Sequence, residues 1–162
     1  MDPNQLSVLY EIQRLKAQYF RFLDTKQWED FRGLFTDDMK LYIEPTPLPE
    51  SSDPTFPSPE ALVTYLSHSH PEKVTVHQGH MAEIDFLSND SARGIWAMFD
   101  WVDDPGRGGA WQGFGHYHEH YVRCPDGRWR IAEVRLTRLR VDSVEPRRPG
   151  PVVRIDPQQH SY

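Results

Sequence analysis

Cysteine and long apolar runs are nearly missing from this chain. Its 162 residues include one cysteine, Cys124. A single thiol cannot form an intramolecular disulfide or a zinc site built from several cysteines. No segment approaches the ~20 consecutive apolar residues that a membrane-spanning helix needs, and no basic-then-apolar signal segment occurs at the N-terminus. We therefore expect a soluble, cytoplasmic protein that does not contact a membrane.

Positive charge is also in short supply. The chain has 18 Lys and Arg against 24 Asp and Glu, which gives a formal net charge of −6. Binding to nucleic acid needs clustered Lys and Arg side chains, so we expect no nucleic-acid partner. At this length, 38% hydrophobic and 26% charged residues are typical of one globular domain that buries a core of its own.

The first third of the chain has helical periodicity. Apolar residues recur at steps of three and four over 6–23, which predicts an amphipathic helix that ends near Asp24. The same spacing predicts a second helix over 26–34. A third helix is predicted over 59–68, because Ser58 can cap it and a proline fits its first position.

Alternating apolar and polar residues dominate the chain after residue 73. This period of two is typical of strands, and turn-forming residues separate the segments. The predicted strands cover 39–43, 73–87, 92–102, 110–123 and 128–141. Helices followed by a run of strands predict an α+β domain. In it, a cone-shaped, curved and mostly antiparallel sheet packs against the N-terminal helices and encloses a pocket.

Proline marks two segments that lack periodicity. Segment 44–60 holds six prolines and is predicted to be a surface loop that helps to cover the mouth of the pocket. Segment 143–162 holds four more and fits a tail, a pocket flap or an oligomer arm. We expect one domain over residues 1–142 and a Pro-rich tail over 143–162.

Asp24 and His77 are candidates for an acid/base pair. A carboxylate that orients an imidazole makes a general base that works near neutral pH without a metal or a nucleotide. Taken alone, each residue also has an ordinary explanation. An Asp at a helix end is commonly a solvated turn former, and a His in a strand is commonly a hydrogen-bonded core or edge residue.

Three histidines, His116, His118 and His120, share one face of a predicted strand. With a nearby carboxylate they could form a facial iron or zinc site. The competing interpretation places them on the outer surface or at an interface between subunits. We favour the second interpretation and expect no metal and no cofactor.

Several short segments, in this order, resemble one known family. They are Tyr19-Phe20-Arg21-Phe22-Leu23-Asp24, Leu34-Phe35-Thr36-Asp37-Asp38, Val76-His77-Gln78-Gly79-His80-Met81, Ala92-Arg93-Gly94-Ile95-Trp96 and Leu136-Thr137-Arg138-Leu139-Arg140. Over about residues 6–142 the chain resembles the SnoaL-like family of the nuclear transport factor 2-like superfamily. Members of this family are α+β cones, and some are cofactor-free dehydratases and dehydrochlorinases that use an Asp/His dyad.

The resemblance implies site residues on both sides of the expected pocket. Asp24 and His77 fall on the positions of the catalytic dyad. The implied substrate-binding residues are Tyr19, Tyr42, Tyr117 and Arg138. Tyrosines on an apolar face also serve packing, and an arginine in an alternating strand often points outward, so these four have an ordinary explanation as well.

The function that follows is a cofactor-independent lyase. We expect a dehydratase that acts on a hydrophobic carbonyl-bearing metabolite, such as a polyketide, a terpenoid or a steroid-like compound. The same base can also serve an isomerase or a cyclase, and the same fold can serve a noncatalytic domain that binds a small ligand or a partner. We also expect a homo-oligomer, a dimer or a trimer, because such cones often pair through exposed sheet faces.

Overall fold

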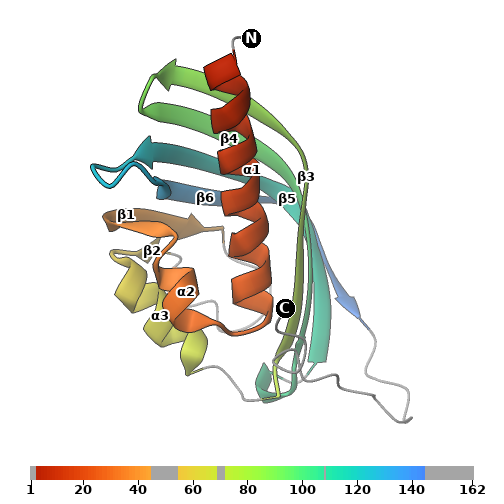
Figure 1. The fold of residues 1–162 in the computed structure, drawn as a ribbon. Coiled ribbons are helices and arrows are strands. Elements are labelled where there is room, and N and C mark those ends of the chain that lie inside the picture. Colours follow the sequence, from red (N-terminus) through yellow and green to blue (C-terminus); the bar gives the residue numbers. More distant parts are fainter. Residues whose placement is uncertain (1–2, 45–54, 69–71, 108, 145–162) are drawn as a thin grey trace.

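The computed structural model describes residues 3–44, 55–68, 72–107 and 109–144 (Figure 1). These ranges contain three α-helices and six strands. They are α1 Pro3–Asp24, α2 Trp28–Arg32, β1 Phe35–Ile43, β2 Thr55–Phe56, α3 Pro59–Ser67, β3 Val74–Ser88, β4 Ser91–Asp104, β5 Gly109–Arg123 and β6 Trp129–Val144, with a short 3-10 turn, Pro105–Arg107, between β4 and β5. Within these residues, no helix is both long enough and apolar enough to cross a bilayer.

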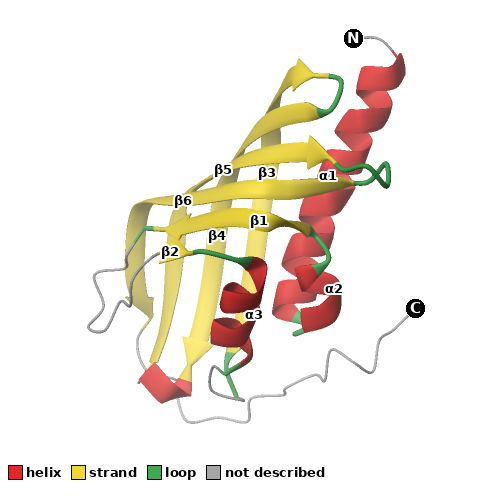
Figure 2. Cartoon of the chain, turned by 90° about the vertical axis from the view of Figure 1, so that its left-hand side faces the viewer, coloured by secondary structure: helices red, strands yellow, loops and turns green. Residues whose placement is uncertain are grey.

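The strands form one curved sheet in the order β2-β1-β6-β5-β4-β3. Strands β3 to β6 make an antiparallel meander, while β1 pairs with β6 in parallel. Helix α1 lies along the concave face, and α2 and α3 lie beside β1 and β2 (Figures 1 and 2). The predicted α+β cone is confirmed, with a sheet that curves around α1 without closing into a barrel.

Some predicted boundaries were wrong. Strand β1 begins at Phe35, four residues before the predicted start. The polar residues that follow Phe35 still belong to the strand, in an irregular part where the pairing with β6 shifts between Phe35 and Lys40. Helix α2 is shorter than predicted and ends at Arg32. Strand β6 runs to Val144. Most of the predicted covering loop, residues 45–54, and the tail after Val144 lie outside the described residues.

Helix α1 ends in a Schellman motif that fixes the position of its last residue. Lys26 donates its backbone N–H to Leu23 O at 3.2 Å, and Gln27 donates to Phe22 O at 2.9 Å. The motif requires a left-handed residue, and Lys26 adopts that conformation with φ of 58°. Asp24 is therefore held at the edge of the concave face, just before the chain turns away.

Glycine allows α1 to approach strand β3. A Cβ atom at Gly79 would lie 2.7 Å from two ring carbons of Phe20, which is closer than packed atoms allow. With no side chain at residue 79, the Phe20 ring of α1 can lie directly against β3 at this level. Beyond it, Met81 bulges out of β3 with a positive φ of 26°, and the pairing with β4 shifts between His80 and Glu83.

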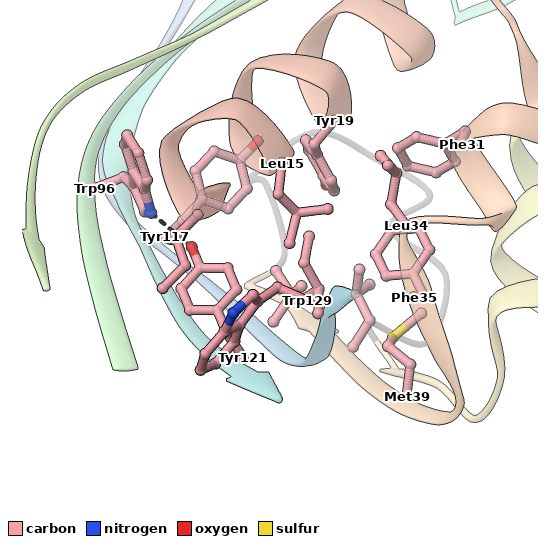
Figure 3. Packing of buried hydrophobic residues seen from close by; sticks show 14 of the residues in the cluster. Leu15, Tyr19, Phe31, Leu34, Phe35, Met39, Trp96, Tyr117, Tyr121 and Trp129 are labelled. Atoms are coloured by element: carbon pink, nitrogen blue, oxygen red, sulfur yellow. Dashed lines mark hydrogen bonds between the residues drawn. The ribbon is translucent and has the colours of Figure 1, made fainter. Parts of the chain in front are cut away.

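The core between α1 and the sheet is rich in aromatic side chains (Figure 3). It also contains a fully buried ion pair, in which Lys16 Nζ lies 2.5 Å from Glu119 Oε1. Lys16 Nζ also lies 3.5 Å from the centre of the Tyr117 ring. Tyr121 donates its hydroxyl hydrogen to Glu119 and accepts a hydrogen bond from the Trp96 indole at 2.8 Å. In this network the buried charges of Lys16 and Glu119 are each other's partners.

Replacing Lys26 with glycine should stabilise the fold. A side chain in the left-handed region costs about 1 kcal/mol, and glycine avoids this cost. We expect Lys26→Gly to raise the free energy of unfolding by about 1 kcal/mol over Lys26→Ala, which keeps the left-handed cost and loses the same side chain. Urea unfolding of the two variants would measure the difference. Equal stabilities would show that the cap stores no strain.

The buried ion pair predicts how stability changes with pH. Burial, opposed by Glu119, lowers the pKa of Lys16 from 10.5 to about 8. Between these two values the folded protein releases a proton that the unfolded chain still holds, so stability should rise with pH in this window. Relative to Lys16→Met/Glu119→Gln, which lacks both charges, we expect a gain of about 1–3 kcal/mol. Chemical unfolding at several pH values would measure it, and parallel curves for the two proteins would contradict it.

Candidate active site

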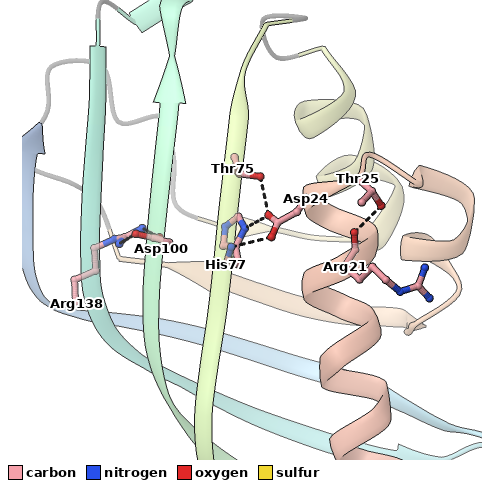
Figure 4. A network of polar contacts seen from close by, with 7 residues as sticks. All are labelled: Arg21, Asp24, Thr25, Thr75, His77, Asp100 and Arg138. Carbon is pink, nitrogen blue, oxygen red and sulfur yellow. Dashed lines mark hydrogen bonds and ion pairs between the residues drawn. The ribbon is translucent and has the colours of Figure 1, made fainter. Parts of the chain in front are cut away.

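The Asp24 carboxylate joins the end of α1 to strand β3. It accepts three hydrogen bonds from two residues of the strand (Figure 4). Thr75 Oγ1 donates to Oδ1 at 2.8 Å, the His77 backbone N–H donates to Oδ2 at 2.8 Å, and His77 Nδ1 lies 2.6 Å from Oδ1. The Asp24 side chain remains 21% exposed. Sequence reasoning had not identified Thr75, although its place two residues before His77 puts it on the same strand face.

This pairing defines the chemistry of the His77 ring. A carboxylate oxygen can only accept, so the neutral imidazole carries its hydrogen on Nδ1 and leaves the lone pair of Nε2 free. Among the described residues, no side chain or backbone group forms a hydrogen bond with Nε2. The ring is largely buried, with 12% of the side chain exposed. An imidazole held in this way can take up a proton at Nε2, and a carboxylate in the position of Asp24 can stabilise the imidazolium that forms.

Two buried tyrosines lie between α1 and β5. Tyr19 projects from the helix and Tyr117 from the strand, with ring centres 5.9 Å apart. Burial, followed by the charge of Glu119, raises the pKa of Tyr19, and burial likewise raises that of Tyr117 well above 10.0. Both hydroxyl groups therefore stay protonated and act as neutral hydrogen-bond donors.

Arg138 lies beyond His77, on the far side from Asp24 (Figure 4). Its guanidinium forms two hydrogen bonds with Asp100, Nη1 to Oδ1 at 3.3 Å and Nη2 to Oδ2 at 3.0 Å. Asp100 is directly opposite His77 in the pairing of β3 and β4. Sequence reasoning missed Asp100, although strand alternation places it on the same face as Met98 and Val102.

Tyr42 does not join this group. It is directly opposite Arg135 in the pairing of β1 and β6, and its ring lies 5.6 Å from the Arg135 guanidinium. Arg135 is exposed, while its neighbours Val134 and Leu136 are buried on the other face of the strand. The structure therefore brings five of the six predicted site residues toward the concave face and places Tyr42 on the opposite face of the sheet.

The three histidines of β5 each have a different neighbour. His120 Nε2 lies 2.8 Å from Ser91 Oγ, and His118 Nε2 lies 3.2 Å from Thr137 Oγ1. The rings of His116 and His118 have centres 6.3 Å apart. Within the described ranges, no group of three or more His, Cys, Asp or Glu side chains is arranged to hold a metal ion.

The described residues also form an open groove of about 590 Å³ along the middle and C-terminal half of α1, from Glu11 to Phe22. Its lining residues come from α1, from α2 and from the turn between β5 and β6. None of the predicted site residues is among them. Its charges are mixed, with Arg14 and Arg128 near Glu11 and Glu29. The groove is therefore separate from the Asp24–His77 pair.

Asp24→Asn should move the ring hydrogen of neutral His77 from Nδ1 to Nε2. The backbone N–H of His77 can only donate, so the amide oxygen of an asparagine must face it and the amide nitrogen must face Nδ1. That nitrogen can only donate, which forces the hydrogen of the neutral ring onto Nε2. Two-bond ¹H–¹⁵N correlation spectra would show the change, and Thr75→Val, which leaves both carboxylate oxygens, should not produce it. An unchanged tautomer in Asp24→Asn would contradict the coupling.

Comparison with known proteins identifies the family of this chain. The chain matches the SnoaL-like domain model over residues 4–135. A probable cyclase of Gibberella zeae, FGR4, is 27% identical over 137 residues, which cover 79% of this chain and 89% of the relative. A hexachlorocyclohexane dehydrochlorinase of the LinA type 2 form is 19% identical, with a TM-score of 0.77 over 93% of this chain and 98% of its own. A Novosphingobium aromaticivorans protein assigned as a scytalone dehydratase is 20% identical, with a TM-score of 0.73 over 96% and 99% of the two chains. The chain therefore belongs to the SnoaL-like family.

Proposed function

We propose that this protein is a cofactor-independent lyase, a dehydratase whose general base is His77. The observation that carries the proposal is the 2.6 Å contact between His77 Nδ1 and Asp24 Oδ1, which leaves Nε2 as the basic atom. The names of the relatives, which include a cyclase, a dehydratase and a dehydrochlorinase, support chemistry that begins with removal of a proton.

The reaction would begin at a carbon next to a carbonyl group. Nε2 of His77 takes the proton from this carbon, and Asp24 stabilises the imidazolium that forms. The electron pair of the broken C–H bond becomes the new double bond as the bond to a β-hydroxyl group breaks. The hydroxyl group takes the proton back from His77 and leaves as water, so the base is regenerated.

Hydrogen-bond donors must stabilise the oxygen of the enolate that develops. Tyr19 and Tyr117 suit this role, because their raised pKa values keep both hydroxyl groups protonated. Arg138 would line the far side of His77, with its guanidinium paired to Asp100. The surrounding rings, among them Phe20 and Trp96, favour a hydrophobic substrate, such as a polyketide, a terpenoid or a steroid-like compound.

An isomerase or cyclase is the second candidate. The relative from Gibberella zeae is named as a probable cyclase. In such a reaction His77 would remove the same proton, and the enolate would be protonated elsewhere or would attack a second carbonyl group, without loss of a hydroxyl group. The two candidates share every residue of the site and differ in the substrate they receive.

Exchange of substrate protons with deuterated solvent would test the base and distinguish the reactions. We expect some member of a panel of hydrophobic β-hydroxy ketones and diketones to exchange its α-proton in D₂O with the wild-type protein, as seen by NMR. Loss of water identifies the dehydratase, and an isomeric product of unchanged formula identifies the isomerase or cyclase. His77→Gln should slow the exchange by about 10²-fold or more.

The matched control is His80→Gln. His80 is on the same strand, exposed on the opposite face from His77, so its replacement should leave the exchange rate unchanged. Equal rates in His77→Gln and His80→Gln would rule out His77 as the base. Binding of panel members beside His77 without exchange in any of them would favour a noncatalytic ligand-binding domain.

A further inference from the structure

The interaction between Asp100 and Arg138 has no part in the Asp24–His77 pair. Asp100 is 3% exposed, and its direct pairing with His77 puts both side chains on the concave face. The imidazole therefore has a carboxylate on either side, Asp24 from the helix and Asp100 from the neighbouring strand (Figure 4). The carboxylate of Asp24 is bound to β3, and that of Asp100 is bound to Arg138.

Arg138 reaches Asp100 across an intervening strand. It is on β6, Asp100 is on β4, and Gly113 of β5 lies between them, directly opposite Asp100. A Cβ atom at residue 113 would overlap both Arg138 Nη1 and Asp100 Oδ1. The absence of a side chain at Gly113 thus makes the space in which the two charged groups meet. Their side chains are 10% and 4% exposed.

The Asp100 carboxylate occupies the end of the Arg138 guanidinium that carries Nη1 and Nη2. Nη1 and Nη2 both donate to the Asp100 carboxylate, and Nε of Arg138 is buried without a hydrogen-bond partner among the described residues. A bidentate arrangement of this kind is the one by which arginine otherwise binds a substrate carboxylate, sulfonate or phosphate. Asp100 therefore stands where an anionic group of a ligand would bind.

Other carboxylates near Arg138 also disfavour the binding of an anion. Glu44 Oε2 accepts the Arg138 backbone N–H at 2.5 Å. Asp104 is buried on the same strand as Asp100, four residues along, and lies 3.5 Å from Lys73. Asp24, Glu44 and Asp104 thus place further carboxylates on the elements around Arg138, and the amine of Lys73 is paired with Asp104. An anion that displaced Asp100 would leave an unpaired buried carboxylate in negative surroundings.

We propose that Asp100 is a specificity-determining residue that closes Arg138 to anionic ligands. The site beside His77 then takes neutral, oxygen-bearing apolar compounds and rejects carboxylates, sulfonates and phosphates of the same size. This inference deepens the proposed function by naming the substrate class, and it rests on that proposal only for the position of the ligand beside His77.

The test uses two fluorescent probes that share an anilinonaphthalene skeleton. N-phenyl-1-naphthylamine is neutral, and 8-anilinonaphthalene-1-sulfonate carries one negative charge. The wild-type protein should bind the neutral probe more tightly. Asp100→Asn removes the competing charge and should strengthen binding of the sulfonate by about 10-fold, with a change of about 2-fold or less for the neutral probe. Chemical-shift changes at His77 would confirm that each probe binds at this site.

Two controls separate the interaction with Arg138 from a general change in charge. Asp104→Asn removes the same charge from the same strand but pairs with Lys73, so it should leave sulfonate binding nearly unchanged. Asp100→Asn/Arg138→Met should lose the gain seen in Asp100→Asn. An equal gain in Asp104→Asn, or a gain that survives loss of Arg138, would overturn the proposal.

The wild-type protein gives a result even if Asp100→Asn fails to fold. Benzoate and acetophenone have the same ring and differ chiefly in charge, and titration followed at the His77 resonances compares them directly. Benzoate binding as tight as that of acetophenone would overturn the proposal. None of these measurements needs turnover, so selectivity without catalysis would count only against the lyase, and catalysis without selectivity only against the role of Asp100.

Discussion

The close approach of α1 to strand β3 is the constraint on which the site depends. The helix can come this near because residue 79 has no Cβ atom to meet Phe20. Its end is then fixed twice, by the left-handed turn at Lys26 and by the three hydrogen bonds that Asp24 accepts from β3. Because α1 is rigid, fixing its end also fixes the positions of residues earlier in the helix. The positions of Tyr19 and Lys16, five and eight residues before Asp24, follow from the same contact.

Two buried ion pairs lie in different parts of the concave face. Lys16–Glu119 lies behind the tyrosines and is enclosed by their rings, while Asp100–Arg138 lies beside His77. Desolvation makes a buried charge costly, and each pair offsets that cost with a partner at hydrogen-bond distance. The aromatic and the charged parts of the face therefore depend on one another. The rings keep water away from the ion pairs, and Glu119 also accepts the hydroxyl hydrogen of Tyr121.

Much of this arrangement could be predicted from the sequence, because periodicity reports which face of an element is buried. The helical stripe of α1, the proline start of α3 and the alternation of β3 to β6 gave the α+β class. Periodicity does not report which distant elements touch, so the placement of Asp24 against His77 rested on family resemblance. The resemblance also implied Tyr42 as a substrate-binding residue, whereas the structure places it on the opposite face of the sheet from His77, because one position along a strand changes the face on which a side chain lies.

The parallel pairing of β1 with β6 joins the two ends of the fold. Phe35 is opposite Ile131 and Ile43 is opposite Leu136, so these partners are more than ninety residues apart along the chain. Local hairpins can form early. Closing so long a loop lowers the conformational entropy of the chain before the contacts between β1 and β6 can stabilise the fold. During synthesis, β1 must wait until almost all the described chain has left the ribosome. Until then the edge of β1 that pairs with β6 remains open, and an open strand edge can pair with another chain.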